Sequence, residues 1–124
     1  MVQTTQEQFE AIVSEAIDAI PEKYYQHIEN VVFMVEDQPS PEQRKKLQLH
    51  GGQTLFGLYE GIPITKRSSG YNMVLPDKIT IFKLPCEWAC ETLEELRKQV
   101  HQTVWHEVAH YYGLDHLQIH ELES

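Results

Sequence analysis

The chain has 124 residues, 41% of them hydrophobic and 10% aromatic, which suits one globular domain spanning residues 1–124 and leaves too little chain for two. Ten basic residues against nineteen acidic ones give a formal net charge of −9, which disfavours a nucleic-acid partner because contacts to phosphates need clustered Lys and Arg. No apolar run reaches membrane-spanning length and the N-terminus lacks a charged-then-apolar signal pattern, so we expect a cytoplasmic monomer without a membrane partner.

The first elements expected along the chain are a helix and a strand. Thr4-Thr5 precedes Gln8 at the spacing of an N-terminal capping box. Apolar residues then recur at three- and four-residue intervals as far as Pro21, which predicts an amphipathic helix. The stretch Val31–Val35 is apolar at successive positions, so it predicts a strand that is buried on both faces. Residues 39–46 form a polar connector with room for one helical turn.

Two further strands and a pair of cysteines follow. Thr54–Tyr59 predicts a second strand, ended by Gly61, and Ile79–Phe82 predicts a third. The long loop between them is of the kind that often carries function or is mobile. Cys86 and Cys90 are the only cysteines, and we expect them to be reduced packing residues, because a helical spacing of four holds two thiols poorly for a disulfide.

The last expected element is a helix over residues 91–112, where helix formers run without an internal Gly or Pro. The helix is apolar on most of its circumference, so we expect it to be buried against the sheet of an α+β domain. Its one polar stripe must then open onto a cleft. The main apolar stripe consists of Leu93, Leu96, Val100, Val104, Val108 and Tyr111, and the polar stripe of Gln99, Thr103, His106 and His110.

Residues 106–116 read HExxHxxGxxH. His106 and His110 project from one face of a helix and lie close enough to share a metal ion. Glu107 lies beside them, placed to reach a water at the metal rather than to bind the metal itself. Three protein ligands leave the fourth zinc position open, which is typical of catalytic sites. The motif therefore predicts Zn²⁺ on His106, His110 and His116, with Glu107 as general base of a hydrolytic reaction.

The third ligand requires the helix to end before it. His116 lies six residues beyond His110, so a continuous helix would carry it about 9 Å along the axis and onto another face. Gly113 is a suitable end, because glycine accepts the left-handed conformation of a C-terminal cap. Asp115 is the alternative ligand. We favour His116, which matches the extended motif, and Asp115 would then orient a ligand histidine through its ring N–H.

The extended motif resembles that of zincin metallopeptidases, and the wider chain is similar to the small bacterial zincin-like metallopeptidase family. The similar stretches are Gly57–Ser68, Leu75–Phe82 and Val104–His116. The resemblance implies a small mixed sheet with the motif helix beneath it, and cleavage of a peptide or protein substrate by zinc on His106 and His110 with Glu107 as the base. In larger zincins an edge strand before the motif helix holds the substrate backbone by strand addition, and by analogy Ile79–Phe82 is the candidate here.

The chain departs from larger zincins downstream of the motif. Metzincins carry a methionine turn after the third ligand, but only eight residues follow His116 and none is Met. An electrophilic group that assists the oxyanion is therefore not fixed by the sequence. The candidates are Arg67, Tyr71, Tyr112 and His120.

Two other functions remain as alternatives. The spacing His-x3-His-x5-His is similar to that of a bacterial endoribonuclease family acting in ribosomal RNA maturation, although the negative net charge and the Glu after the first His disfavour it. The second alternative is a catalytically silent zinc-binding adaptor. The metal itself could be another first-row ion.

Overall fold

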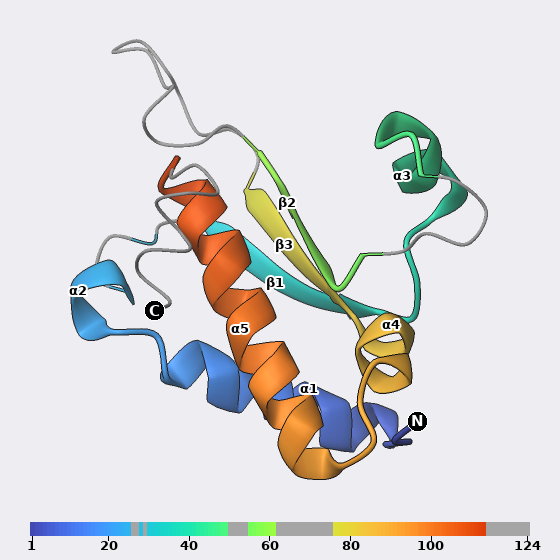
Figure 1. Ribbon diagram of the computed structural model, residues 1–124. Coiled ribbons are helices and arrows are strands. Elements are labelled where there is room, and N and C mark those ends of the chain that lie inside the picture. Colours follow the sequence, from blue (N-terminus) through green and yellow to red (C-terminus); the bar gives the residue numbers. More distant parts are fainter. Residues whose placement is uncertain (26–27, 29, 50–54, 62–75, 114–124) are drawn as a thin grey trace, which may run out of the picture.

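Helices flank a small mixed sheet in the computed structural model of the protein (Figure 1), which describes residues 1–25, 28, 30–49, 55–61 and 76–113. The elements in chain order are α1 (Gln6–Asp18), α2 (Glu22–Tyr25), β1 (Val31–Glu36), α3 (Pro41–Lys46), β2 (Gly57–Glu60), β3 (Asp77–Phe82), α4 (Lys83–Trp88) and α5 (Leu93–Tyr111). The α+β class expected from the sequence is confirmed.

The sheet of the described residues has the order β1-β3-β2, so β3 is its central strand. β1 runs parallel to β3, and β2 runs antiparallel to it. Ile79 at the middle of β3 lies between Phe33 of β1 and Tyr59 of β2. Every β3 residue except Lys78 is buried, as expected for a strand with a neighbour on each side.

The prediction of a strand buried on both faces at Val31–Val35 is wrong. Burial alternates along β1, and the side chains of Val32 and Met34 are 42% and 38% exposed. Val31, Phe33 and Val35 pack against the core from the other face of the strand. An apolar run is compatible with a strand that is buried on both faces. Burial of the second face also requires another layer of structure packed on it, and the run itself does not encode that layer.

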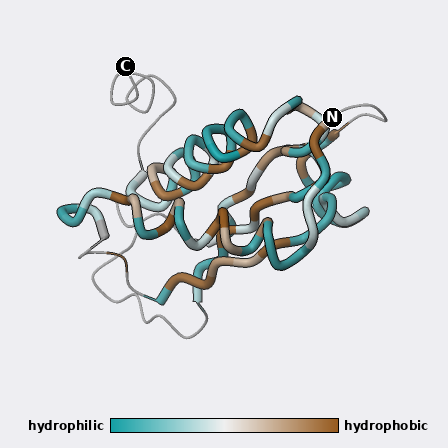
Figure 2. The backbone as a smooth tube through the Cα atoms, turned by 90° about the horizontal axis from the view of Figure 1, so that it is seen from below, coloured by the Kyte–Doolittle hydropathy of each residue, from teal (hydrophilic) through white to brown (hydrophobic). Residues whose placement is uncertain are grey.

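The core forms where α1 and α5 meet one face of the sheet. Phe9, Ile12 and Val13 of α1 share a cluster with Ile79 and Ile81 of β3 and with the buried stripe of α5. Seen from below, the helical coils show teal on their outer side and brown on their inner side (Figure 2). Within the described ranges, no helix is both long enough and apolar enough to cross a membrane.

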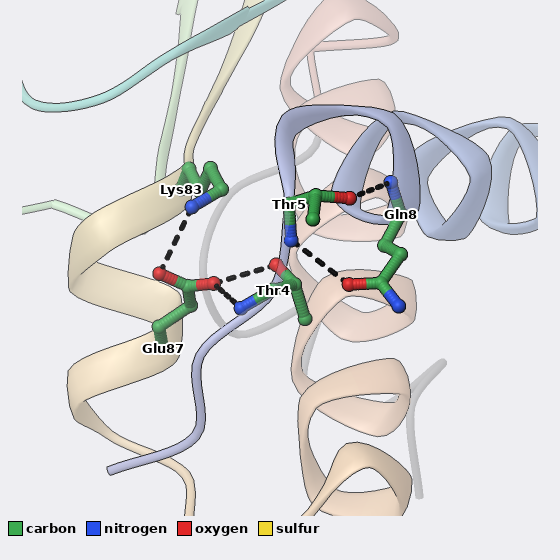
Figure 3. A network of polar contacts seen from close by, with 5 residues as sticks. All are labelled: Thr4, Thr5, Gln8, Lys83 and Glu87. Atoms are coloured by element: carbon green, nitrogen blue, oxygen red, sulfur yellow. Dashed lines mark hydrogen bonds and ion pairs between the residues drawn. The ribbon is translucent and has the colours of Figure 1, made fainter.

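The N-terminal segment is fastened to α4 by a buried carboxylate (Figure 3). Glu87, 2% exposed, accepts hydrogen bonds from the backbone N–H of Thr4 (2.7 Å) and from its hydroxyl (2.6 Å), and forms an ion pair with the Lys83 ammonium (3.2 Å). The next residue, Thr5, caps α1: it exchanges hydrogen bonds with Gln8 at 2.9 and 3.1 Å, which confirms the predicted capping box. The network thereby fixes where α1 begins.

Replacing Glu87 with glutamine should lower the free energy of unfolding by about 2 kcal/mol, because the amide weakens charge-assisted hydrogen bonds in a buried position. Denaturant unfolding measures the effect. Glu91→Gln is the matched control: Glu91 binds the N-terminal ammonium with a side chain that is 80% exposed, and its loss should cost below about 0.5 kcal/mol. Equal costs for the two variants would contradict the assignment of Glu87 as a buried anchor.

Cys86 and Cys90 are free thiols, and both are buried in the core, as expected for packing residues. Cys86 lies in α4, and Cys90 follows the end of that helix. Burial raises the pKa of the Cys86 thiol to about 12, so it stays protonated at neutral pH.

Candidate metal centre

The motif lies on α5, which spans Leu93–Tyr111 and so confirms the expected helix to within two residues at each end. Thr92 caps its first turn by accepting a hydrogen bond from the backbone N–H of Glu95 at 3.1 Å. All residues of the predicted apolar stripe are buried except Leu93, which is 53% exposed in the first turn. Because this apolar stripe packs on the core, the neighbouring polar stripe has a fixed orientation.

His106 and His110 lie one turn apart on this polar stripe. Their ring centroids are 4.7 Å apart, with an interplanar angle of 79°. One ligand atom from each imidazole and one carboxylate oxygen of Glu107 all lie within 4.8 Å of one another. Two half-buried imidazoles at this separation suit zinc, which favours nitrogen donors in a tetrahedral arrangement.

Glu107 differs from the two histidines in being almost completely buried, with 7% of its surface exposed. Burial raises the pKa of its carboxyl group to about 7, while the backbone N–H of Tyr59, which donates a hydrogen bond to the carboxylate, acts in the opposite direction. A carboxyl group that titrates near neutral pH is matched to general base catalysis.

A cleft of about 290 Å³ runs between α5 and the start of β2. It contains much of the predicted polar stripe, which confirms that this stripe opens onto a cleft. The lining residues are Phe56, Gly57, Gln99, Gln102, Thr103, His106 and Glu107.

The strand at the rim of this cleft is β2 and not Ile79–Phe82. The analogy that placed substrate binding on Ile79–Phe82 is wrong, because β3 is hydrogen-bonded to a strand on each side. On the β2 side, the N–H of Phe82 donates to the carbonyl of Phe56 at 2.9 Å. Backbone groups alternate along an antiparallel strand, so those of Gly57 and Tyr59 point away from β3. The N–H of Tyr59 donates to Glu107 of α5.

Gly57 allows β2 to approach α5 closely. A Cβ at this position would lie 2.6 Å from Cγ2 of Thr103, 3.2 Å from the carbonyl oxygen of Thr80 and 3.3 Å from Cγ of Glu107. The sequence interpretation did not assign Gly57 to the site. The available signal was a glycine inside a strand pattern, which indicates close backbone approach.

Gly57→Ala should therefore destabilise the protein by about 1–3 kcal/mol, the usual cost of overpacking. Thr103→Ser removes the methyl group that clashes and keeps the hydroxyl, which donates to the carbonyl of Gln99 at 2.8 Å. The alanine should cost less in the Thr103→Ser background than in the wild type, as measured by a double-mutant cycle of unfolding free energies. Strict additivity would show that Thr103 does not limit the approach of the strand.

Gly113 ends α5 as predicted, with φ +78° and its N–H bonded to the carbonyl of His110 at 2.9 Å. His116 and Asp115 lie outside the described residues, so their choice as third ligand stays a prediction. Arg67, Tyr71 and His120 also lie outside them. Among the oxyanion candidates Tyr112 is described, and its hydroxyl donates to the backbone carbonyl of Tyr24.

A family model described as zincin-like metallopeptidase matches residues 28–124. The chain belongs to this family. The match covers β1, the β2 rim and all of α5, and it confirms the resemblance drawn from the zincin motif.

A solved structure, of a conserved hypothetical protein from Thermus thermophilus, has the same fold as this zincin-like protein. The two share 20% sequence identity with a TM-score of 0.58, over 97% of this chain and 100% of the other. At this identity the likeness concerns the fold alone. No curated protein matches the chain.

Proposed function

We propose that this zincin-like protein is a zinc-dependent peptidase that hydrolyses peptide bonds. The observation that carries the proposal is the buried Glu107 carboxylate, which lies beside the paired imidazoles of His106 and His110 on the wall of the cleft. We assign His106, His110 and His116 as the residues that would hold the zinc ion. Zinc, when bound, would act as a Lewis acid toward the scissile carbonyl and promote ionisation of the attacking water.

The protein supplies the remaining steps from α5 and β2. An extended peptide would add to the outer edge of β2, where the backbone groups of Gly57 point away from β3. This would place its scissile carbonyl over His106 and His110. Glu107 would accept a proton from the attacking water and deliver it to the leaving amine, which suits a carboxyl group with a pKa of about 7.

Glu107→Gln tests the assignment, because the amide keeps the shape of the side chain and cannot accept the proton. The purified wild type and variant should hold equal zinc by elemental analysis, while turnover of a broad peptide library should fall at least about a hundredfold in the variant. Equal turnover would refute Glu107 as the base. Equal zinc content without turnover by either protein would favour the adaptor alternative.

A further inference from the structure

Tyr59 of β2 is tied to the first residue of the central strand. Its hydroxyl donates a hydrogen bond to Oδ2 of Asp77 at 2.6 Å. Asp77 is 4% exposed, and its own backbone N–H donates to the carbonyl of Asn30 at 3.0 Å. A buried carboxylate that is fixed by its backbone on one side offers a rigid acceptor for the phenol on the other.

Gly61 leaves the space that the carboxylate of Asp77 occupies. A Cβ on Gly61 would lie 2.4 Å from Cγ of Asp77 and within 2.8 Å of both carboxylate oxygens. Only a residue without a side chain therefore lets Asp77 reach the Tyr59 hydroxyl in this position. The ring of Tyr59 also packs edge-on against Tyr111 of α5, with centroids 6.2 Å apart at 85°.

The backbone of the same tyrosine faces the candidate metal centre. Its N–H points away from β3, because the hydrogen-bonded pairs of β2 and β3 are set by the bond from Phe82 to Phe56. That N–H donates to the carboxylate of Glu107. Tyr59 thus joins Asp77 through its side chain and Glu107 through its backbone, on opposite sides of one short strand.

We infer that Tyr59 is a positioning residue for Glu107. The hydrogen bond from its hydroxyl to Asp77, whose carboxylate fits only because Gly61 has no side chain, holds Tyr59 in place. The inference rests on the proposed function for its catalytic consequence. It gives a shared role to Tyr59, to Gly61 and to Asp77 at the start of β3, none of which the proposed peptidase steps use. The backbone N–H of Tyr59 thereby holds the carboxylate of Glu107, a residue that lines the cleft.

Tyr59→Phe is the first test, because it removes the bond to Asp77 and keeps the ring against Tyr111. The zinc-loaded variant should bind zinc as the wild type does and keep KM within about twofold, while kcat falls about ten- to a hundredfold through misplacement of the base. The matched control is Thr5→Ala, which removes a hydrogen bond at the remote cap of α1. It should lower the unfolding midpoint to a similar extent and leave kcat unchanged.

Amide hydrogen exchange at residue 59 tests the positioning without any turnover. The wild type should protect this amide, and Tyr59→Phe should exchange it at least about tenfold faster, since the strand opens locally while the core stays closed. Thr5→Ala should leave it as protected as in the wild type. Asp77→Asn, which keeps the size of the acceptor and loses its charge, should give an intermediate rate and provides the same readout where Tyr59→Phe folds poorly.

The two readouts separate the failure of this inference from the failure of the proposed function. Unchanged protection of residue 59 in both Tyr59→Phe and Asp77→Asn would overturn the inference, whether or not the protein cleaves peptides. Faster exchange in a protein that cleaves no peptide would support the positioning of Glu107 and refute the peptidase. A fall in kcat in Thr5→Ala equal to that in Tyr59→Phe would reduce Tyr59 to a general stabilising residue and so overturn its positioning role.

Discussion

Replacing His110 with alanine is expected to weaken zinc binding at least about a hundredfold, more than the loss of a residue that only orients a ligand. His106 and His110 bring their ligand atoms to within 4.8 Å of each other. Removal of the His110 imidazole therefore leaves His106 as the one histidine of the candidate ligand group among the described residues. Competition with a chromogenic chelator measures the affinity. A second readout is thermal unfolding, since zinc at a hundred times its Kd should stabilise the wild type by about 2.7 kcal/mol and the variant by far less.

His101→Ala provides the matched control for the zinc experiment. His101 lies on the same helix, but its ring faces Glu15 of α1 at 3.7 Å and takes no part in the candidate ligand group. Its replacement should leave the zinc affinity unchanged. If His101→Ala and His110→Ala weaken zinc binding equally, or if neither does, the metal lies elsewhere.

The motif helix was predictable because its evidence is local. Periodic apolar residues and a glycine at position 113 lie within α5 or next to it, and the structure confirms both ends of the helix to within two residues. The spacing of His106 and His110 then determines their shared face without reference to the rest of the chain. The core of the candidate site could therefore be inferred from a single stretch of sequence.

The arrangement of the strands was not predictable in the same way. Val31–Val35 is more uniformly apolar than the Asp77–Phe82 strand, yet the latter lies in the centre and is buried. Strand order depends on pairing between segments far apart in the chain, and no local pattern states it. The prediction of the wrong substrate-binding strand has the same cause, since an edge is a property of the whole sheet.

The environment of Glu107 also depends on long-range packing. Its burial arises because Gly57 lets β2 lie against α5, and its hydrogen bond comes from a backbone N–H of Tyr59 that carries no sequence signature. The motif therefore identified the residue and its role as a candidate base. Its shifted pKa could be inferred only from the folded chain.

That shifted pKa predicts that Glu107→Gln stabilises the metal-free protein at alkaline pH. The folded pKa of about 7 lies above the ordinary value of 4.5, so the protonated carboxyl favours the folded state, and this contribution is complete below about pH 4.5 and lost as the pH rises through 7. At pH 4 wild type and variant should be equally stable. Above pH 8 the variant should be more stable by about 3 kcal/mol, because only the wild type then buries an ionised carboxylate.

Denaturant unfolding of chelator-treated protein between pH 4 and pH 9 measures this difference. Glu94→Gln is the control: it lies on the same helix with a side chain that is 83% exposed, and its effect should not vary with pH. A pH-independent difference for Glu107→Gln would show that the carboxylate is well solvated. The predicted rise would instead show that the fold gives up stability to keep an ionisable group beside the two histidines, as expected where a buried group serves chemistry rather than folding.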